Sequence, residues 1–559
     1  MDGDVLHVKQ RGTELLHNPR LNKGSAFTHE ERRELGLIGL LPPEVSTLQE
    51  QQARVMENYR KEGTDLDKYI YLRLLQDRNE TLFHAVLTAH LEEMAPIVYT
   101  PTVAEAVRNF SHIFRSSRGL YITPKNIEHI DEMLEEVGAD DIGVIVCTDN
   151  EGILGIGDHG VGGIGIPIGK LALYVAAGGF DPGECLPVTL DVGTENEDLL
   201  NDPLYLGTRQ RRLGGDEYRA FIDSFIDGVR RQCPQAVLQW EDFSRDRAFD
   251  NLERYRKRLP SFNDDIQGTA VVTYAALLGA LSIAGREIAT EEIVIIGAGA
   301  AGVGVAQGLM AAKIAAGASE DDASATVHVF DSRGLVVSDR EDLPEYKRRV
   351  ATDAALVRQW GLDGDDLRLE AFVKARRPGT VIGLSGHRGV IDEPMVRAVS
   401  KRWDRPIIFA LSNPSDNSDA HPHDVVKWSD GSAIIATGSP FEPLDYGGKT
   451  HRFTQVNNVY AFPGVGAGAH VCGSRNISDA MMVAAGNAVH DAVCEDDLHK
   501  GRVLPEISRL REVSLQVAQA VIRAAQKEGI ARIHLPVDIT SHLDEWQYIP
   551  RYKKYKPAT

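Results

Sequence analysis

The first part of the chain, residues 1–117, has apolar residues at helical spacing. In the segment Asp67–Met94 the apolar positions recur every three or four residues, and no proline interrupts them. Pro96 and Pro101 follow, and a proline disfavours the helical conformation in the residue before it. We therefore predict an N-terminal helical domain, closed by a short extended piece that carries Tyr99 between the two prolines.

From residue 118 the pattern changes to short apolar runs that alternate with turns and helical stretches. Asp141–Asp149 has the composition of a buried strand and leads into a glycine-rich segment. A similar mixture returns late in the chain, so we predict one mixed α/β domain made of residues 118–263 and 457–523. Residues 524–559 are basic and aromatic. We expect this segment to pack on a neighbour, with a nucleic-acid tail as the alternative.

Residues 264–456 have the pattern of a dinucleotide-binding domain. The apolar run Ile293–Ile296 precedes a GxGxxG turn, and this turn opens a helix. A second strand ends in an acid at the place where such domains contact the ribose hydroxyls. We predict a Rossmann-type, doubly wound domain whose cofactor-binding residues are Gly297, Gly299, Ala300, Ala301, Gly302 and Asp331. The fold class is then α/β and multidomain, with this domain, the mixed α/β domain and the N-terminal helical domain.

Two pairs of adjacent acids stand at the edges of predicted elements. Asp264 and Asp265 precede a helix of small residues, whereas Glu241 and Asp242 follow the apolar run 236–240. Oxygen ligands without a local His or Cys suit Mg²⁺ or Mn²⁺ rather than Zn²⁺. The pair before the helix is equally consistent with an N-terminal cap, because acids are favoured at that end of a helix.

Lys170 is a candidate general base, and Tyr99 is well positioned between two prolines. Lys170 opens an apolar helix after the glycine-rich turn, where partial burial would lower its pKa toward that of a useful base. The plainer alternative is an exposed lysine that only solvates the surface. For Tyr99 the plainer alternative is an aromatic ring packed under a turn.

Composition narrows the class of protein. The 559 residues carry a net charge of -20, which argues against a nucleic-acid footprint. The five cysteines form no CxxC pair, which is typical of buried free thiols in a reducing compartment. We find no apolar run of membrane-spanning length and no leader-like N-terminus, so we expect a cytoplasmic protein without a membrane partner.

With these residues in hand, the chain resembles the malic enzymes. The segments MAPIVYTPTV, ILGIGDHGVGGIGIPIGKLALY, WEDF, FNDDIQGTA, GAGAAG, FALSNPS and NNVYAFPG occur in the order of that family. The resemblance implies oxidative decarboxylation of L-malate to pyruvate and CO₂ with reduction of NAD or NADP. It also implies a requirement for Mg²⁺ or Mn²⁺ and a homodimer or homotetramer.

The resemblance also implies roles for individual residues. It makes Lys170 the general base, Tyr99 the general acid and Asp264 the acid that assists Lys170. Lys347 lies near the position where NADP-dependent relatives bind the 2′-phosphate with a lysine, so both cofactors are expected, with NAD favoured. The implied metal ligands are Glu241, Asp242 and Asp265, and the amides implied to hold substrate and nicotinamide are Asn413, Asn457 and Asn458.

One position departs from the family pattern. Malic enzymes usually carry a substrate-binding arginine just before ILGxGD, whereas this chain has Gly152 there. The related malolactic enzymes, which convert L-malate to L-lactate and CO₂ with bound NAD, also carry glycine. Malolactic activity is therefore the alternative, and an inactive metabolite-binding relative is a third. Arg118 is a candidate to replace the missing cation.

Overall fold

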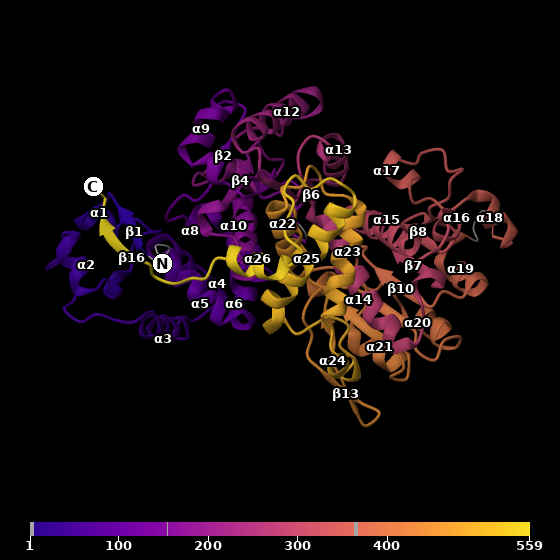
Figure 1. Ribbon diagram of the computed structural model, residues 1–559. Coiled ribbons are helices and arrows are strands. Elements are labelled where there is room, and N and C mark those ends of the chain that lie inside the picture. The colour runs from indigo at the N-terminus through magenta and orange to yellow at the C-terminus, as the bar shows by residue number, and fades with distance from the viewer. Residues whose placement is uncertain (1–4, 154, 363–366, 559) are drawn as a thin grey trace.

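The computed structural model describes residues 5–153, 155–362 and 367–558. Figure 1 shows the N-terminal helices at one end of the molecule, a seven-stranded sheet at the other and a five-stranded sheet between them. The structure thus confirms an α/β protein with parallel sheets and a helical N-terminal region.

The N-terminal region is helical because its turns carry strong start signals. Thr28, Thr47 and Thr64 each accept a hydrogen bond from the backbone N–H three residues later, which forms capping boxes at the starts of α2, α3 and α4. The helices are α1 (Gly12–Leu16), α2 (His29–Glu34), α3 (Leu48–Tyr59), α4 (Asp65–Arg78), α5 (Glu80–Ala89), α6 (Leu91–Val98), α7 (Thr102–Arg108) and α8 (Phe110–Ile113).

The predicted extended piece between the two prolines is wrong. Helix α6 continues through Pro96 to Val98, and Tyr99 is the residue that ends it. Pro96 removes one internal hydrogen bond, but Met94, Ile97 and Val98 are buried, and their packing stabilises the helix. Tertiary packing here overrides the local preference of the residue before a proline.

The five-stranded sheet is parallel throughout and has the order β2-β4-β3-β5-β6. Every residue of β3 and β5 is buried, as expected for parallel strands that are covered on both faces. Helices α9 and α12 pack together on one side, and α10 contacts β3 and β4. The bounds are β2 (Leu120–Ile122), β3 (Val144–Thr148), β4 (Cys185–Leu190), β5 (Val237–Glu241), β6 (Ser261–Asn263), α9 (Ile130–Glu136), α10 (Gly165–Leu173), α11 (Glu197–Asn201), α12 (Gly215–Gln232) and α13 (Arg245–Tyr255).

The seven-stranded sheet has the order β15-β12-β11-β10-β7-β8-β9 and is parallel except for the pairing of β8 with β9. The chain passes from β7 to β8 on one side and places β10 on the other side of β7. This change of direction is the topological switch point at which doubly wound sheets bind ligands. The bounds are β7 (Ile293–Ile296), β8 (Val327–Asp331), β9 (Gly334–Leu335), β10 (Thr380–Gly383), β11 (Ile407–Ala410), β12 (Ile434–Thr437), β15 (Thr454–Gln455), α15 (Ala300–Ala315), α16 (Glu320–Ser324), α17 (Glu345–Arg348), α18 (Ala354–Gln359), α19 (Leu369–Arg376), α20 (Glu393–Ser400) and α21 (Pro422–Trp428).

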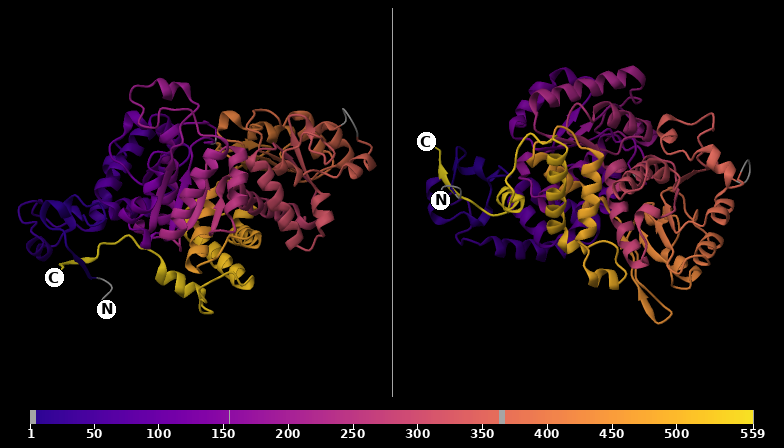
Figure 2. Two further views of the ribbon diagram at one scale, coloured as in Figure 1. Left: turned by 90° about the horizontal axis from the view of Figure 1, so that it is seen from above. Right: turned by 45° about the vertical axis from the view of Figure 1, so that its right-hand side comes forward.

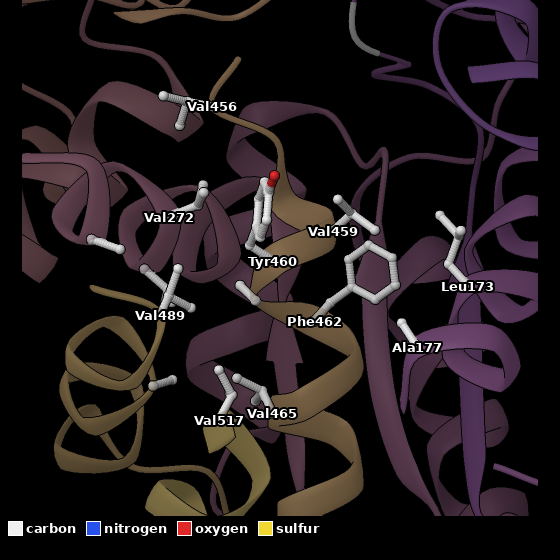
Figure 3. Close-up of a cluster of buried hydrophobic side chains, with 14 of the residues drawn as sticks. Leu173, Ala177, Val272, Val456, Val459, Tyr460, Phe462, Val465, Val489 and Val517 are labelled. Carbon is white, nitrogen blue, oxygen red and sulfur yellow. The ribbon is translucent and has the colours of Figure 1, made fainter. Parts of the chain in front are cut away.

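A layer of apolar helices joins the two sheets. Its members are α14 (Thr269–Ala284), α22 (Phe462–Val471), α23 (Asp479–Asp491) and α25 (Leu510–Lys527). Figure 3 shows Phe462 of α22 directed toward Leu173 and Ala177, while Val465 faces Val517. The predicted boundary between residues 523 and 524 falls inside α25, because Ala525 is still part of its buried face.

Two of the core helices correct our expectation about long apolar runs. Gly160–Gly178 and Asp264–Ala284 are long and apolar enough to span a membrane, but 100% and 78% of their most apolar windows are buried inside the protein. That burial is typical of core helices. The cysteines differ from expectation at two places, because Cys494 is exposed and Cys185 is only partly buried.

The C-terminal segment packs on the N-terminal region of the same chain. After α24 (Glu495–His499) and α26 (Ile539–Trp546), strand β16 (Lys554–Pro557) pairs in parallel with β1 (Val5–Val8). Both views of Figure 2 show the two termini at the same end of the molecule. Buried Lys23 contributes to this contact, because its Nζ lies 3.9 Å from the centre of the Tyr555 ring and 2.5 Å from the Glu31 carboxylate.

Candidate active site

The two acidic pairs meet at one edge of the five-stranded sheet. Strands β5 and β6 are parallel neighbours with Trp240 opposite Asn263, so the residues that follow them lie side by side. The carboxylate oxygens of Glu241, Asp242 and Asp265 lie within 4.8 Å of one another.

The alternative that Asp264 and Asp265 cap a helix is wrong. Asn263 is the cap, because its Oδ1 accepts the Ile266 N–H at 3.0 Å. Asp264 and Asp265 lie in the first turn of the helix, where their carboxylates are directed to the site. The Asp265 carboxylate also accepts the Asp242 N–H at 2.8 Å, which links the two acidic pairs.

The electrostatics of this cluster favour a bound cation. Burial raises the pKa of Glu241 well above its usual range, and burial raises the pKa of Asp265 to about 6. Adjacent buried carboxylates repel each other, so a divalent ion among them would stabilise their charged forms. The three side chains therefore fit Mg²⁺ or Mn²⁺, which prefer oxygen ligands.

Lys170 lies fully buried on α10, beside the acidic cluster. Its Nζ contacts the Asp264 carboxylate and lies 2.9 Å from Glu241 Oε1. The alternative of an exposed, solvated lysine is therefore wrong. The prediction of a lowered pKa is also wrong: burial lowers the pKa of Lys170, but Asp264 and Glu241 outweigh it and raise this pKa well above its usual value.

Tyr99 joins Lys170 through a close approach of two helices. A Cβ at Gly169 of α10 would lie 2.4 Å from the Val98 carbonyl oxygen, so only glycine allows α10 to touch the end of α6. The contact brings the Tyr99 ring centre to 5.3 Å from Lys170 Nζ. Burial raises the pKa of Tyr99 well above its usual value, so its hydroxyl stays protonated at neutral pH.

The three predicted amides have different surroundings. Asn458 belongs to the site. Its Nδ2 donates to the carboxylate of Asp264 at 3.1 Å and to the backbone carbonyl of Asp264 at 3.0 Å. Asn457 accepts the Val459 N–H at 3.0 Å, which shapes the local turn. Asn413 follows β11. A Cβ added at Gly155 of the glycine-rich segment would lie 3.2 Å from the backbone carbonyl oxygen of Asn413, so the two segments lie close together.

The GxGxxG turn lies at the switch point of the seven-stranded sheet. Gly297 has φ of 121°, and a Cβ there would lie 2.3 Å from the Leu384 carbonyl oxygen at the end of β10. Gly302 is equally tight against the Gly297 carbonyl, whereas nothing lies within 4 Å of a Cβ at Gly299. Gly299 precedes α15, whose first residues are Ala300 and Ala301, and no side chain caps this helix. Free N–H groups next to open space fit the pyrophosphate of a dinucleotide.

Asp331 ends β8, but two cations already hold it. Its Oδ2 accepts hydrogen bonds from Lys347 Nζ at 2.7 Å and from the Arg340 guanidinium. Burial opposes ionisation, yet Arg340 and Lys347 lower the pKa of Asp331 to about 2. Arg340 belongs to no sequence motif, so its contact with Asp331 was not predicted from the sequence.

Gly152 lies against the backbone next to the acidic cluster. Its N–H donates to the Asp242 carbonyl at 2.8 Å, and a Cβ would lie 2.5 Å from the Phe243 carbonyl oxygen. Arg118 does not replace the missing cation, because it pairs with Glu80 at 2.6 Å and with Asp77 at 3.5 Å in the helical region.

Two further arginines hold the segment that contains Gly152. Arg212 is buried among Asp149, Glu151 and Asp158, and Arg247 lies 3.1 Å from Asp149 and 2.9 Å from Glu151. These ion pairs fix the start of the glycine-rich segment.

Other residues of the site also escaped the sequence analysis. Gln239 Nε2 donates to Glu241 at 2.9 Å, and Tyr174 donates to Gln239 at 2.5 Å. The Phe462 ring centre lies 4.6 Å from Lys170 Nζ. The one available signal was a glutamine two residues before Glu241 in an otherwise apolar strand, since alternate residues of a strand face the same way.

Comparison with known sequences identifies two domains. The sequence model for "Malic enzyme, N-terminal domain" matches residues 76–256, and that for "Malic enzyme, NAD binding domain" matches residues 266–526. The second match joins the seven-stranded sheet and the helices that follow it in one domain. Our predicted division at residue 457 assigned that sheet and those helices to different domains.

Relatives and solved structures agree with these matches. The chain is 43% identical to the NAD-dependent malic enzyme of Acinetobacter baylyi over 551 residues, which cover 99% of this chain and 97% of that protein. The enzyme of the same name from Sodalis glossinidius is also 43% identical, covering 99% and 98%. The fold resembles malic enzymes from Pyrococcus horikoshii (TM-score 0.55, 24% identity, 81% of this chain and 89% of that one) and Entamoeba histolytica (TM-score 0.56, 22% identity, 91% of each chain). Matched in sequence over almost its whole length, the chain belongs to the malic enzyme family.

Proposed function

We propose that this protein catalyses the oxidative decarboxylation of L-malate to pyruvate and CO₂, with reduction of NAD and with Mg²⁺ or Mn²⁺ bound. The observation that carries the proposal is the contact of buried Lys170 with Asp264 and Glu241, next to the carboxylates of Asp242 and Asp265. An amine and a cation site in one water-poor cluster suit the removal of a proton from a hydroxy acid.

The chain's own residues supply the proton transfers. Lys170 accepts the proton of the C2 hydroxyl, which allows hydride to leave C2, and Asp264 orients its amine. After CO₂ departs, Tyr99 donates a proton to the enolate carbon, and its raised pKa keeps the hydroxyl protonated until that step. A bound divalent cation would polarise the C2 oxygen and, by taking up carboxylate charge, reduce the pKa of Lys170; bound NAD would accept the hydride.

Malolactic activity is the second candidate, and Gly152 favours it. The structure gives this glycine no room for the substrate-binding arginine expected of malic enzymes. Against it, the relatives at 43% identity bear the name NAD-dependent malic enzyme. An inactive relative is the weakest candidate, since Tyr99, Lys170 and the acidic cluster are all assembled.

A single incubation separates these candidates. The protein is mixed with L-malate, Mn²⁺ and excess NAD, while reduced cofactor is followed by absorbance and pyruvate and lactate are assayed. Pyruvate equal to reduced cofactor supports the proposal. Lactate without reduced cofactor establishes the malolactic reaction instead, and no product from malate leaves only the inactive relative.

We also propose that the enzyme accepts NADP, with NAD favoured. Asp331 is suited to the ribose hydroxyls, while Lys347 and Arg340 beside it offer cations to a 2′-phosphate. We further propose a homodimer or homotetramer in the cytoplasm. Light scattering of the purified protein measures its oligomeric mass.

A further inference from the structure

A second cavity lies at the opposite end of the helix that begins in the site. This helix, Asp264–Ala284, starts with Asp264 and Asp265, and Ser282 near its other end lines the cavity. At 1.5 Å per residue, the distance along the helix from Asp265 to Ser282 is about 25 Å. The cavity is therefore separate from the catalytic cluster and from the GxGxxG turn at the opposite ends of the β-strands.

The walls come from five parts of the chain. They are the end of α14, the end of α24 with the residues after it, Arg405 before β11, the start of β12 with the residues before it, and residues 449–453. The last part is β14 (Lys449–His451) with the two residues after it, and β14 forms a hairpin with β13 (Leu444–Tyr446). Figure 1 shows α24 beside this hairpin at the lower edge of the molecule. The cavity volume is about 650 Å³, in the range of sites for small organic ligands.

The charge of the lining is opposite to that of the whole protein. Its charged side chains are all basic in the part of the chain that the structure describes, although the protein carries a net charge of -20. A positive cavity on a negative molecule concentrates small anions. The basic lining residues are Arg405, Lys449, His451, Arg452, His499 and Lys500.

Two of these cations are available for a ligand. Lys500 pairs with Asp496, and Arg405 donates to the Ser432 carbonyl at 3.1 Å. The side chains of Lys449 and Arg452, by contrast, make no ion pair or hydrogen bond with any described residue. Both line the cavity, Lys449 from β14 and Arg452 from the position directly after it.

The rest of the lining contains an apolar part. Ile283, Ile434, Leu498 and Phe453 contribute to the wall beneath the cations. An inorganic anion would use only the cations, whereas a ligand with an apolar or aromatic body would also cover this surface. We propose that the cavity is a binding site for a small organic phosphate, with its phosphate on Lys449 and Arg452 and its body on the apolar wall.

Calorimetric titration of the full chain tests this assignment. Phenyl phosphate is the probe and inorganic phosphate the comparison, at low ionic strength, with EDTA to remove metals and saturating NAD to fill the dinucleotide site. We expect phenyl phosphate to bind more tightly than phosphate. The Lys449→Glu/Arg452→Glu variant should weaken phenyl phosphate binding by about tenfold or more, and added salt should weaken it in the wild type.

The control reverses two exposed charges elsewhere on the same domain, in the variant Lys374→Glu/Lys401→Glu. It should bind phenyl phosphate like the wild type. Equal losses in both variants, or no loss in either, would overturn the assignment. It would also fail if the wild type did not bind phenyl phosphate. A changed oligomeric mass in the Lys449→Glu/Arg452→Glu variant would then identify the cavity as a contact between copies of the chain.

Discussion

Replacing Gly152 is the sharpest test of how this site differs from the family pattern. The substitution Gly152→Arg would restore the missing guanidinium, and from sequence alone it is expected to lower KM for malate if the pocket has room. The structure predicts the opposite, because the obstacle is met at Cβ, before any guanidinium is placed. That atom would lie 2.5 Å from the Phe243 carbonyl oxygen and 2.8 Å from its carbonyl carbon.

The expected loss of stability follows from the rigidity of the Phe243 backbone, which the added Cβ would meet. Backbone can yield only by moving, and Phe243 directly follows Asp242, a proposed metal ligand, whose carbonyl accepts the Gly152 N–H at 2.8 Å. Overpacking of this kind costs about 1–3 kcal/mol. We therefore expect Gly152→Ala, which adds only the Cβ, to lower the free energy of unfolding by that amount and to weaken Mn²⁺ binding. Gly152→Arg should lose at least as much, with kcat/KM reduced.

Chemical denaturation and Mn²⁺ titration measure both effects on purified protein. Gly214→Ala is the matched control, since nothing lies within 4 Å of a Cβ there and its backbone is extended, with φ of −133°. It should be within about 0.5 kcal/mol of the wild type. A Gly152→Ala protein as stable as this control, with unchanged Mn²⁺ affinity, would refute the steric argument, and so would a lower KM in Gly152→Arg.

Four further predictions concern the site. Asp265→Ala should abolish metal-dependent turnover while dinucleotide binding, followed by fluorescence, survives; near-normal turnover at low metal would contradict the ligand role. Lys170→Ala should lower kcat by roughly 10² to 10⁴ with little effect on malate binding, whereas a raised KM at constant kcat would make Lys170 a binding residue. Lys347→Gln should reduce kcat/KM for NADP selectively, by about 1–3 kcal/mol of transition-state binding, and equal losses with NAD would refute its placement. In the metal-free protein the pKa of Asp265 is about 6, compared with 3.8 in the unfolded chain. The folded state binds this proton more tightly, so its contribution to stability is fully present below pH 3.8 and is lost as the pH rises through 6. The melting temperature should therefore fall between pH 5 and 7 more than in Asp265→Asn, and saturating Mn²⁺ should remove the difference.

Local patterns predicted most of the elements, and the family resemblance implied the main cluster. The alternation of apolar runs and glycine turns predicted the doubly wound sheet and a mixed α/β domain. The acidic pairs at the ends of β5 and β6 left a metal site and a helix cap open, and the resemblance to the malic enzymes implied their shared oxygen-ligand cluster. These predictions succeed because carboxyl ends of parallel strands meet at one edge, so residues far apart in sequence become neighbours by rule. Asp264 and Glu241 are an example, and so is Asn458, which reaches Asp264 from beyond the second sheet.

Features set by long-range packing could not be predicted in this way. Whether α6 survives Pro96 depends on the burial of its other residues, and the end of α25 depends on what covers its apolar face. The direction of the Lys170 pKa shift depends on the balance between burial and two carboxylates, and only their distances decide it. Arg340 has no motif, and its role appears only when the fold places it against Asp331.

Close packing of helices, rather than ion pairs alone, joins the two halves of the site. A Cβ at Gly304 of α15 would lie 2.6 Å from the Ile266 carbonyl oxygen, so the helix that begins at the dinucleotide turn lies directly on the turn that carries Asp264 and Asp265. Gly169 makes the corresponding contact between α10 and the end of α6. Dispersion contacts at such distances resist displacement in every direction, whereas an exposed ion pair tolerates movement. The close approach of helix backbones at Gly304 and Gly169 therefore sets how near the dinucleotide turn lies to the carboxylates and how near α10, which carries Lys170, lies to Tyr99.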